Sequence, residues 1–138
     1  MERRDLIEDQ IEQLGKFLRN LVSTFLKLKS TKTELESINY VSDKFKEEFN
    51  LDLNQFIAFS EEEIKQLITE YKLTDNHLET LSDLMFEMHS VQYNNINLSK
   101  QYLIRAIELL DFADEISTTF SLNRNNKKAH LKTTLNEL

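Results

Sequence analysis

The amino-acid sequence predicts an all-α protein, and this prediction depends on its turn-forming residues and its hydrophobic spacing. The 138-residue chain contains one glycine and no proline. Sheets joined by tight turns need residues that tolerate positive φ angles, whereas helices and short interhelical loops can use Asn, Asp, Ser and Thr. Apolar residues recur at helical spacing along most of the chain. We therefore predict a single helical domain over residues 1–138, a bundle of five to six helices.

The first helix is predicted over residues 3–29. Its apolar residues are spaced alternately by four and three positions: Ile7, Ile11, Leu14, Leu18, Leu21, Phe25 and Leu28. This spacing is typical of coiled coils, but further apolar residues widen the stripe, as in helices packed within a bundle. The width favours a core helix, and the alternative is a dimer seam formed by Ile7, Ile11, Leu14, Leu18 and Leu21. Gly15 lies inside this helix, where we expect a close helix crossing to offset its cost of ~1 kcal/mol.

A second helix follows the first and continues to about residue 49. Thr31 or Thr33 is available as its N-cap, because threonine hydroxyls accept hydrogen bonds from free backbone amides. The two helices form a predicted hairpin over about residues 3–49.

Residues 50–72 form a connector in which two short helices are predicted, over 53–58 and 61–71. Two residue pairs at the starts of these helices have the spacing of capping boxes: Asp52 with Gln55, and Ser60 with Glu63. The three consecutive glutamates that begin the second short helix suit the positive end of a helix. We favour this interpretation over a metal site.

A second hairpin is predicted over about residues 74–119. Its first helix runs from Asp75 to about Tyr93, and its second runs from Leu98 to about Thr119. The turn between them is rich in asparagine, which tolerates left-handed backbone positions better than other non-glycine residues. A last helix over residues 123–138 contains few apolar residues, so we expect it to pack weakly.

The second hairpin resembles a tetratricopeptide repeat. In that repeat the second helix carries a small, a bulky apolar and a small residue, and the same places are taken here by Ser99, Leu103 and Ala106. The first helix supplies the matching apolar pattern: Leu81, Leu84, Met85 and Met88. A weaker echo lies 65 residues upstream, at Glu34, Ile38 and Val41. The chain thus looks like two tetratricopeptide-like antiparallel hairpins, and it resembles a family of small uncharacterised bacterial proteins for which the resemblance implies no catalytic residues.

Charge is unevenly distributed along the chain. The formal net charge is −7, and residues 33–90 carry 14 acidic against 4 basic side chains. Residues 123–138 carry four cations against one acid: Arg124, Lys127, Lys128 and Lys132 against Glu137. An acidic body argues against nucleic acid as the partner. The sequence contains no cysteine, no apolar leader and no membrane-spanning stretch, which together predict a cytoplasmic protein without a membrane partner.

Motifs for catalysis or metal binding are missing from the sequence. The histidines His77, His89 and His130 have no carboxylate or histidine at the spacing that places two ligands on one helix face. A nucleophile elbow and a phosphate-binding loop both need glycines that this chain lacks. We therefore predict a protein that is not an enzyme, with no metal and no cofactor.

The predicted function is a non-catalytic interaction or scaffold module that binds a protein or peptide. Its candidate partner-binding residues are Phe86, Gln92 and Tyr93, which lie off the main apolar stripe of their helix. The other interpretation of these aromatics is packing against the 61–71 helix or the N-terminal helix. Two alternative functions are a small-ligand sensor or enzyme with a pocket between helices, and a structural protein that forms a homodimer through its N-terminal helix.

Overall fold

A computed structural model of the chain describes residues 3–92 and 94–138, and every regular element in them is a helix. The helices are α1 (Arg3–Thr31), α2 (Glu34–Phe49), α3 (Leu53–Ala58), α4 (Glu61–Tyr71), α5 (Asp75–Ser90), α6 (Ile96–Ile116) and α7 (Leu122–Asn136). The all-α prediction is confirmed. The predicted count of five to six helices is wrong, because the described residues form seven, including both short helices of the connector.

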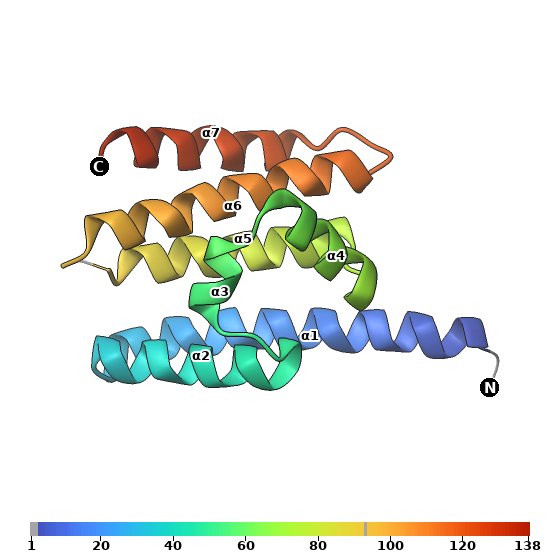
Figure 1. Ribbon diagram of the computed structural model, residues 1–138, viewed down its shortest axis with the longest axis horizontal. Coiled ribbons are helices and arrows are strands. Elements are labelled where there is room, and N and C mark those ends of the chain that lie inside the picture. The colour runs from blue at the N-terminus through green and yellow to red at the C-terminus, as the bar shows by residue number, and fades with distance from the viewer. Residues whose placement is uncertain (1–2, 93) are drawn as a thin grey trace.

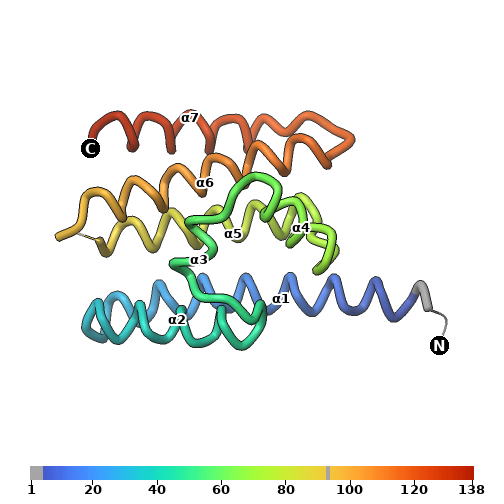
Figure 2. Tube along the Cα trace, viewed as in Figure 1, coloured from blue at the N-terminus to red at the C-terminus, as the bar shows by residue number. Residues whose placement is uncertain are grey.

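The long helices lie side by side in the order α7, α6, α5, α1 and α2, with α3 and α4 across one face of this row (Figure 1). The backbone trace shows the same order, with a short turn joining α1 to α2 (Figure 2). The α5–α6 pairing is the most extensive in the molecule, and α1 packs against both α2 and α5. The N-terminal end of α1 extends beyond the ends of the other helices.

The helix boundaries follow local capping chemistry. The capping boxes at Asp52 and Ser60 both form, so α3 and α4 begin where the sequence predicts. The left-handed backbone positions among the described residues are Asn50 and Lys72, which end α2 and α4. The asparagine-rich turn is therefore not left-handed at its described residues; instead the Asn95 side chain accepts the Leu98 N–H and caps α6.

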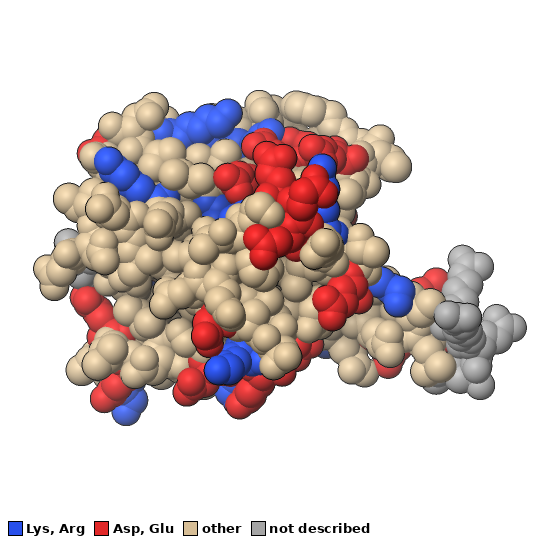
Figure 3. Space-filling model, viewed as in Figure 1, with Lys and Arg blue, Asp and Glu red and all other residues tan. Residues whose placement is uncertain are grey.

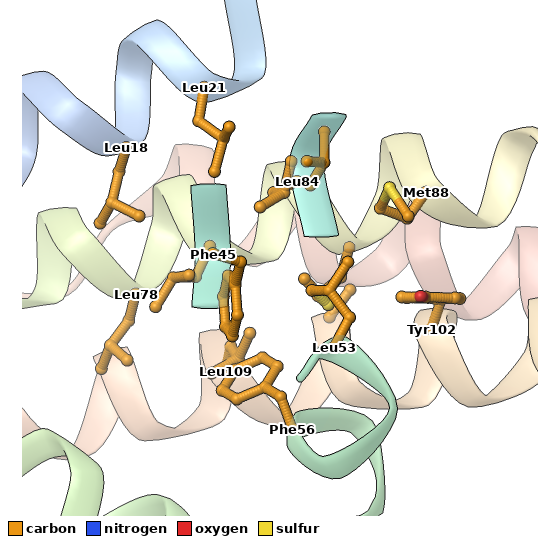
Figure 4. Packing of buried hydrophobic residues seen from close by; sticks show 14 of the residues in the cluster. Leu18, Leu21, Phe45, Leu53, Phe56, Leu78, Leu84, Met88, Tyr102 and Leu109 are labelled. Carbon is orange, nitrogen blue, oxygen red and sulfur yellow. The ribbon is translucent and has the colours of Figure 1, made fainter. Parts of the chain in front are cut away.

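The core lies where α3 fills the space between the two hairpins (Figure 4). Phe45 of α2 and Phe56 of α3 are fully buried, with their ring centroids 5.2 Å apart. Leu109 of α6 reaches the same cluster. Burying a phenylalanine stabilises a fold by about 1.5–3 kcal/mol, so α3 joins the hairpins through these rings although it is only six residues long.

A buried arginine fixes the connector to α6. Arg105 is 4% exposed, and its Nη2 donates to the carbonyl oxygens of Ile57 and Phe59. Its Nη1 donates to Glu108 Oε2 at 2.7 Å. Burial lowers the pKa of Arg105, and the nearby charges of Glu108 and Glu63 oppose that effect. One cation thus binds two carbonyls at the C-terminal end of α3, where helix carbonyls lack partners within the helix.

Side chains, rather than the backbone of another helix, are the nearest neighbours of Gly15. A methyl group added at this position would have Arg19 Nη1 at 3.1 Å and His77 Nε2 at 3.5 Å as its nearest neighbours. The second distance is an ordinary van der Waals contact, and the first involves the flexible end of an exposed side chain. The helix that packs against α1 at Gly15 is α5, and it approaches the glycine through the His77 side chain rather than through its backbone.

Candidate functional site: the groove between α1 and α4

An open groove lies between the N-terminal half of α1 and the C-terminal ends of α2 and α4. Its volume is ≈ 430 Å³. The lining from α1 comprises Ile7, Gln10, Ile11, Gln13, Leu14 and Phe17, and the lining from the ends of the other two helices comprises Glu48, Glu70, Tyr71 and Lys72. The floor is thus mainly apolar, whereas the end wall is mainly charged.

The apolar stripe of α1 divides into a covered part and an open part. Leu14, Leu18 and Leu21 are 7%, 1% and 3% exposed and belong to the core of their own chain. Ile7 and Ile11 are only half-buried and line the groove. The division follows from the position of α1, whose N-terminal end projects past the helices that cover the rest of it. A seam for a second chain is therefore available at Ile7 and Ile11, while the other three residues pack within the chain.

Tyr71 forms the corner of the groove. It is half-buried, and its ring packs edge-on against Phe49 with centroids 5.0 Å apart. Burial raises the pKa of the Tyr71 hydroxyl, and the negative charges of Glu70 and Glu48 raise it further. The phenol and both carboxylates therefore lie at one end of the apolar floor, where the two carboxylates create a negative potential.

A second hollow continues from the first on the other side of Tyr71. Its volume is ≈ 340 Å³, and it shares Glu70 and Tyr71 with the α1–α4 groove. Phe59 and Leu51, both half-buried, contribute apolar surface to it. The two hollows are thus neighbours that share Glu70 and Tyr71 in their walls.

The residues predicted to bind a partner lie elsewhere. Phe86 is half-buried and lines a hollow of ≈ 170 Å³ between α5 and α7. Its ring packs edge-on against that of His130 of α7, with the ring centroids 5.8 Å apart. It is tilted against the ring of His89 on its own helix, with the centroids 5.2 Å apart. Gln92 is half-buried just after α5, and Tyr93 lies outside the described residues. The Phe86 ring therefore contacts α7 through His130, a contact that the apolar spacing of α7 did not indicate.

The basic C-terminal helix binds the acidic body of the same chain. Acids at every fourth position of α5 pair with cations of the flanking helices: Asp75 and Glu79 with Arg124, Asp83 with Lys127, and Glu87 with Lys29. Lys128 of α7 pairs with two acids of α6, Asp111 and Asp114. The apolar contribution of α7 is small, with Leu131 buried and Leu135 half-buried. This helix is thus attached mainly by ion pairs, which the spacing of its apolar residues does not reveal.

His77 is a buried titratable group close to the groove. Its Nδ1 accepts the Thr74 N–H at 3.0 Å, so the neutral ring carries its proton on Nε2, which donates to the Ile11 carbonyl at 2.8 Å. Burial lowers its pKa; the bond to Ile11 opposes this, the Arg19 charge lowers it and the Asp75 charge raises it. Both ring nitrogens are therefore engaged, and the Nε2 bond holds α5 to α1.

No family model, curated protein or solved structure matches this chain. Within residues 3–92 and 94–138, no group of three or more His, Cys, Asp or Glu side chains could hold a metal ion. No helix in that part of the chain combines the length and the apolar character that crossing a bilayer requires.

Proposed function

We propose that this chain is a non-catalytic protein-interaction module that binds a helix of a partner in the α1–α4 groove. The observation that carries the proposal is the division of the α1 stripe. Ile7 and Ile11 continue the periodicity of the core leucines, yet they face an open groove rather than the interior. Leu6, on the same projecting end, is 48% exposed. Apolar side chains at helical spacing along a groove are the usual means of recognising an amphipathic helix.

The size of the groove limits the affinity that its apolar floor can supply. Ile7, Ile11, Phe17 and Tyr71 are half-buried, and completing the burial of each would contribute about 1 kcal/mol. Their sum, about 4 kcal/mol, lies at the lower end of the roughly 4–15 kcal/mol that association costs in lost freedom. Apolar contact alone would therefore give weak binding, and a stable complex needs charged contacts or further surface at the rim.

We further interpret the α5–α6 pair as a tetratricopeptide-like hairpin. Ser99, Leu103 and Ala106 are 5%, 0% and 0% exposed, which supports their assignment to the contact face of α6. The Ser82 hydroxyl donates to the Ala106 carbonyl at 2.8 Å, a distance that requires small residues where the two helices meet. The α1–α2 pair would be the more divergent of the two hairpins.

Site-specific photo-crosslinking tests the proposed interface. The protein would carry a benzophenone amino acid at Ile7 and would be irradiated in the cells that normally produce it. The control would carry the same group at Leu35, which is 66% exposed on α2 and lies outside the groove. We expect a discrete adduct from Ile7 that Leu35 does not give. Identical adducts from both positions, or none from Ile7, would refute the groove as an interface.

Self-association through the same surface is the second candidate function, because the projecting end of α1 is itself an apolar helix. Sedimentation equilibrium at several protein concentrations tests it. We expect Ile7→Asp to abolish any dimer that uses this surface. A dimer that persists in the variant would place the contact elsewhere.

A further inference from the structure

We propose that the occupant of the α1–α4 groove is a basic amphipathic helix from a partner protein, whose lysines or arginines pair with Glu48 and Glu70. This inference rests on the proposed function and names the chemistry of the partner. It follows from the charges at the end of the groove, from the way this chain already binds a basic helix, and from the charges that a second copy would bring.

Two helix C-termini meet at the end wall of the groove. Glu48 lies in the last turn of α2, and Glu70 lies in the last turn of α4. The C-terminal end of a helix carries a partial negative charge and favours cations, so glutamates in these turns are unfavourable in the free protein. The last turn of α4 contains no basic residue. The pKa of Tyr71, raised by burial and then by Glu70 and Glu48, reflects the same local field.

These two glutamates differ from the acids of α5 because no cation neutralises them. Both are exposed, and within the described residues neither has a lysine, arginine or histidine at ion-pair distance. Lys72 also lines the groove, but its single positive charge does not balance the two glutamates, so the net charge of the lining is negative. Acidic side chains gather on this face of the molecule around α4 (Figure 3). A cation that arrives with a partner would therefore meet an unneutralised negative site.

The chain shows in its own structure how its acidic helices bind a basic one. On α7, Lys127 and Lys128 reach carboxylates of α5 and α6, while Leu131, one turn later, enters the apolar core. An apolar side chain that follows two cations by three and four residues thus fits this type of surface. The same spacing in a partner helix would place an apolar residue on the floor of the groove and a cation at its end wall.

Charge also distinguishes this partner from a second copy of the chain. The N-terminal end of α1, residues 3–13, contains four acids, Asp5, Glu8, Asp9 and Glu12, against two cations, Arg3 and Arg4, and its formal charge is therefore negative. A second copy that inserted this segment would bring like charges toward Glu48 and Glu70. Like-charge juxtaposition at an interface is unfavourable, whereas a lysine-bearing helix gains from the same field.

Designed peptides provide the test. Three fluorescein-labelled amphipathic helical peptides of equal length would carry the same leucine face and differ only in the polar face, which would be lysine, glutamine or glutamate. Fluorescence anisotropy with the intact protein would measure each Kd. We expect the lysine peptide to bind most tightly, and we expect its Kd to rise about twofold to thirtyfold in Glu48→Gln/Glu70→Gln, the range for two exposed ion pairs.

A matched variant separates local pairing from overall charge. Glu115→Gln/Glu137→Gln changes the net charge by the same amount at two exposed positions outside the groove. If this control weakens the lysine peptide as much as the groove variant does, binding follows net charge and the inference is wrong. Far-ultraviolet circular dichroism would verify that both variants keep the wild-type helix content.

The outcomes also separate this inference from the function on which it rests. If the glutamine or glutamate peptide binds as tightly as the lysine peptide, and Ile7→Asp abolishes that binding, the groove binds helices but the basic partner is refuted. If Ile7→Asp changes the binding of no peptide, the groove itself is refuted as an interface. A dimer that Ile7→Asp abolishes and that excludes the lysine peptide would identify a second copy as the occupant instead.

Discussion

Replacing Arg124 by alanine should loosen the C-terminal helix more than any other single charge change on it. The Arg124 side chain is 3% exposed and contacts three carboxylates on two helices. Its Nη1 lies 3.1 Å from Asp114 of α6, and its Nη2 lies 3.2 Å from Asp75 and 3.6 Å from Glu79 of α5. Burial lowers the pKa of Arg124, but the hydrogen bond to Asp114 and the charges of Glu79, Asp114 and Asp75 outweigh it and raise the pKa overall.

The magnitude follows from what each group loses. Breaking a fully buried ion pair costs about 3–5 kcal/mol, because one charge is left without a partner in a poorly solvated site. Here the charges left behind are carboxylates that are 34%, 18% and 40% exposed, so water recovers part of the loss. The Nε of Arg124 is buried without a partner, and its removal relieves a small penalty. We therefore expect the free energy of unfolding to fall by about 2 kcal/mol.

Urea unfolding followed by circular dichroism at neutral pH measures this loss. The matched control is Lys132→Ala, which removes one positive charge from an exposed position of the same helix and should change the free energy of unfolding by less than about 0.5 kcal/mol. Relative to the wild-type protein, the Arg124 variant should show a larger acceleration of amide hydrogen exchange in α7 than in α1. If both variants lose the same stability, net charge rather than the Arg124 contacts attaches α7, and the reasoning fails.

Three further outcomes follow from buried polar groups and from the glycine. Gly15→Ala should leave the free energy of unfolding unchanged or raise it by up to about 1 kcal/mol, since only the Arg19 guanidinium has to move; a loss of more than about 1 kcal/mol would contradict this. Because burial lowers the pKa of His77, the unfolded chain binds more protons, so urea midpoints should fall as the pH drops below about 6.5, and His77→Gln should show a smaller fall. Arg105→Met should lower the free energy of unfolding by about 2 kcal/mol and should accelerate amide hydrogen exchange more in α3 than in α5. Equal acceleration in both helices would show that this arginine does not specifically hold the connector.

The sequence determines most of the secondary structure because capping is local. The capping boxes at Asp52 and Ser60 involve residues three positions apart, so their spacing alone locates the starts of α3 and α4. A third capping box, formed by Thr74 and His77 at the start of α5, is harder to recognise in the sequence. There His77 takes the place usually held by glutamate or glutamine. The asparagine turn differs from its prediction for a related reason: asparagine suits both left-handed positions and N-caps, and Asn95 is used as a cap.

Contacts between distant segments are less accessible to sequence reasoning. Only three leucines mark the C-terminal helix beyond residue 130, so apolar spacing predicts a weakly packed element. Its attachment depends on which acids face it, and that depends on how α5 and α6 are rotated in the folded chain. The spacing of four between Asp75, Glu79 and Asp83 is present in the sequence and places these acids on one face of α5. No local rule, however, indicates which cation reaches them.

The candidate site illustrates the same limit most directly. A helix that packs into its own core and a helix that binds a partner use the same apolar period, so the spacing from Ile7 to Leu21 supports both interpretations. What separates them is how much of α1 the rest of the chain covers. Leu14 is buried in the core, whereas Ile7 and Ile11 are half-buried and line a hollow together with the C-terminal end of α4. The boundary between core and binding surface is therefore set by the lengths and positions of other helices, and it falls within a stripe that is uniform in sequence.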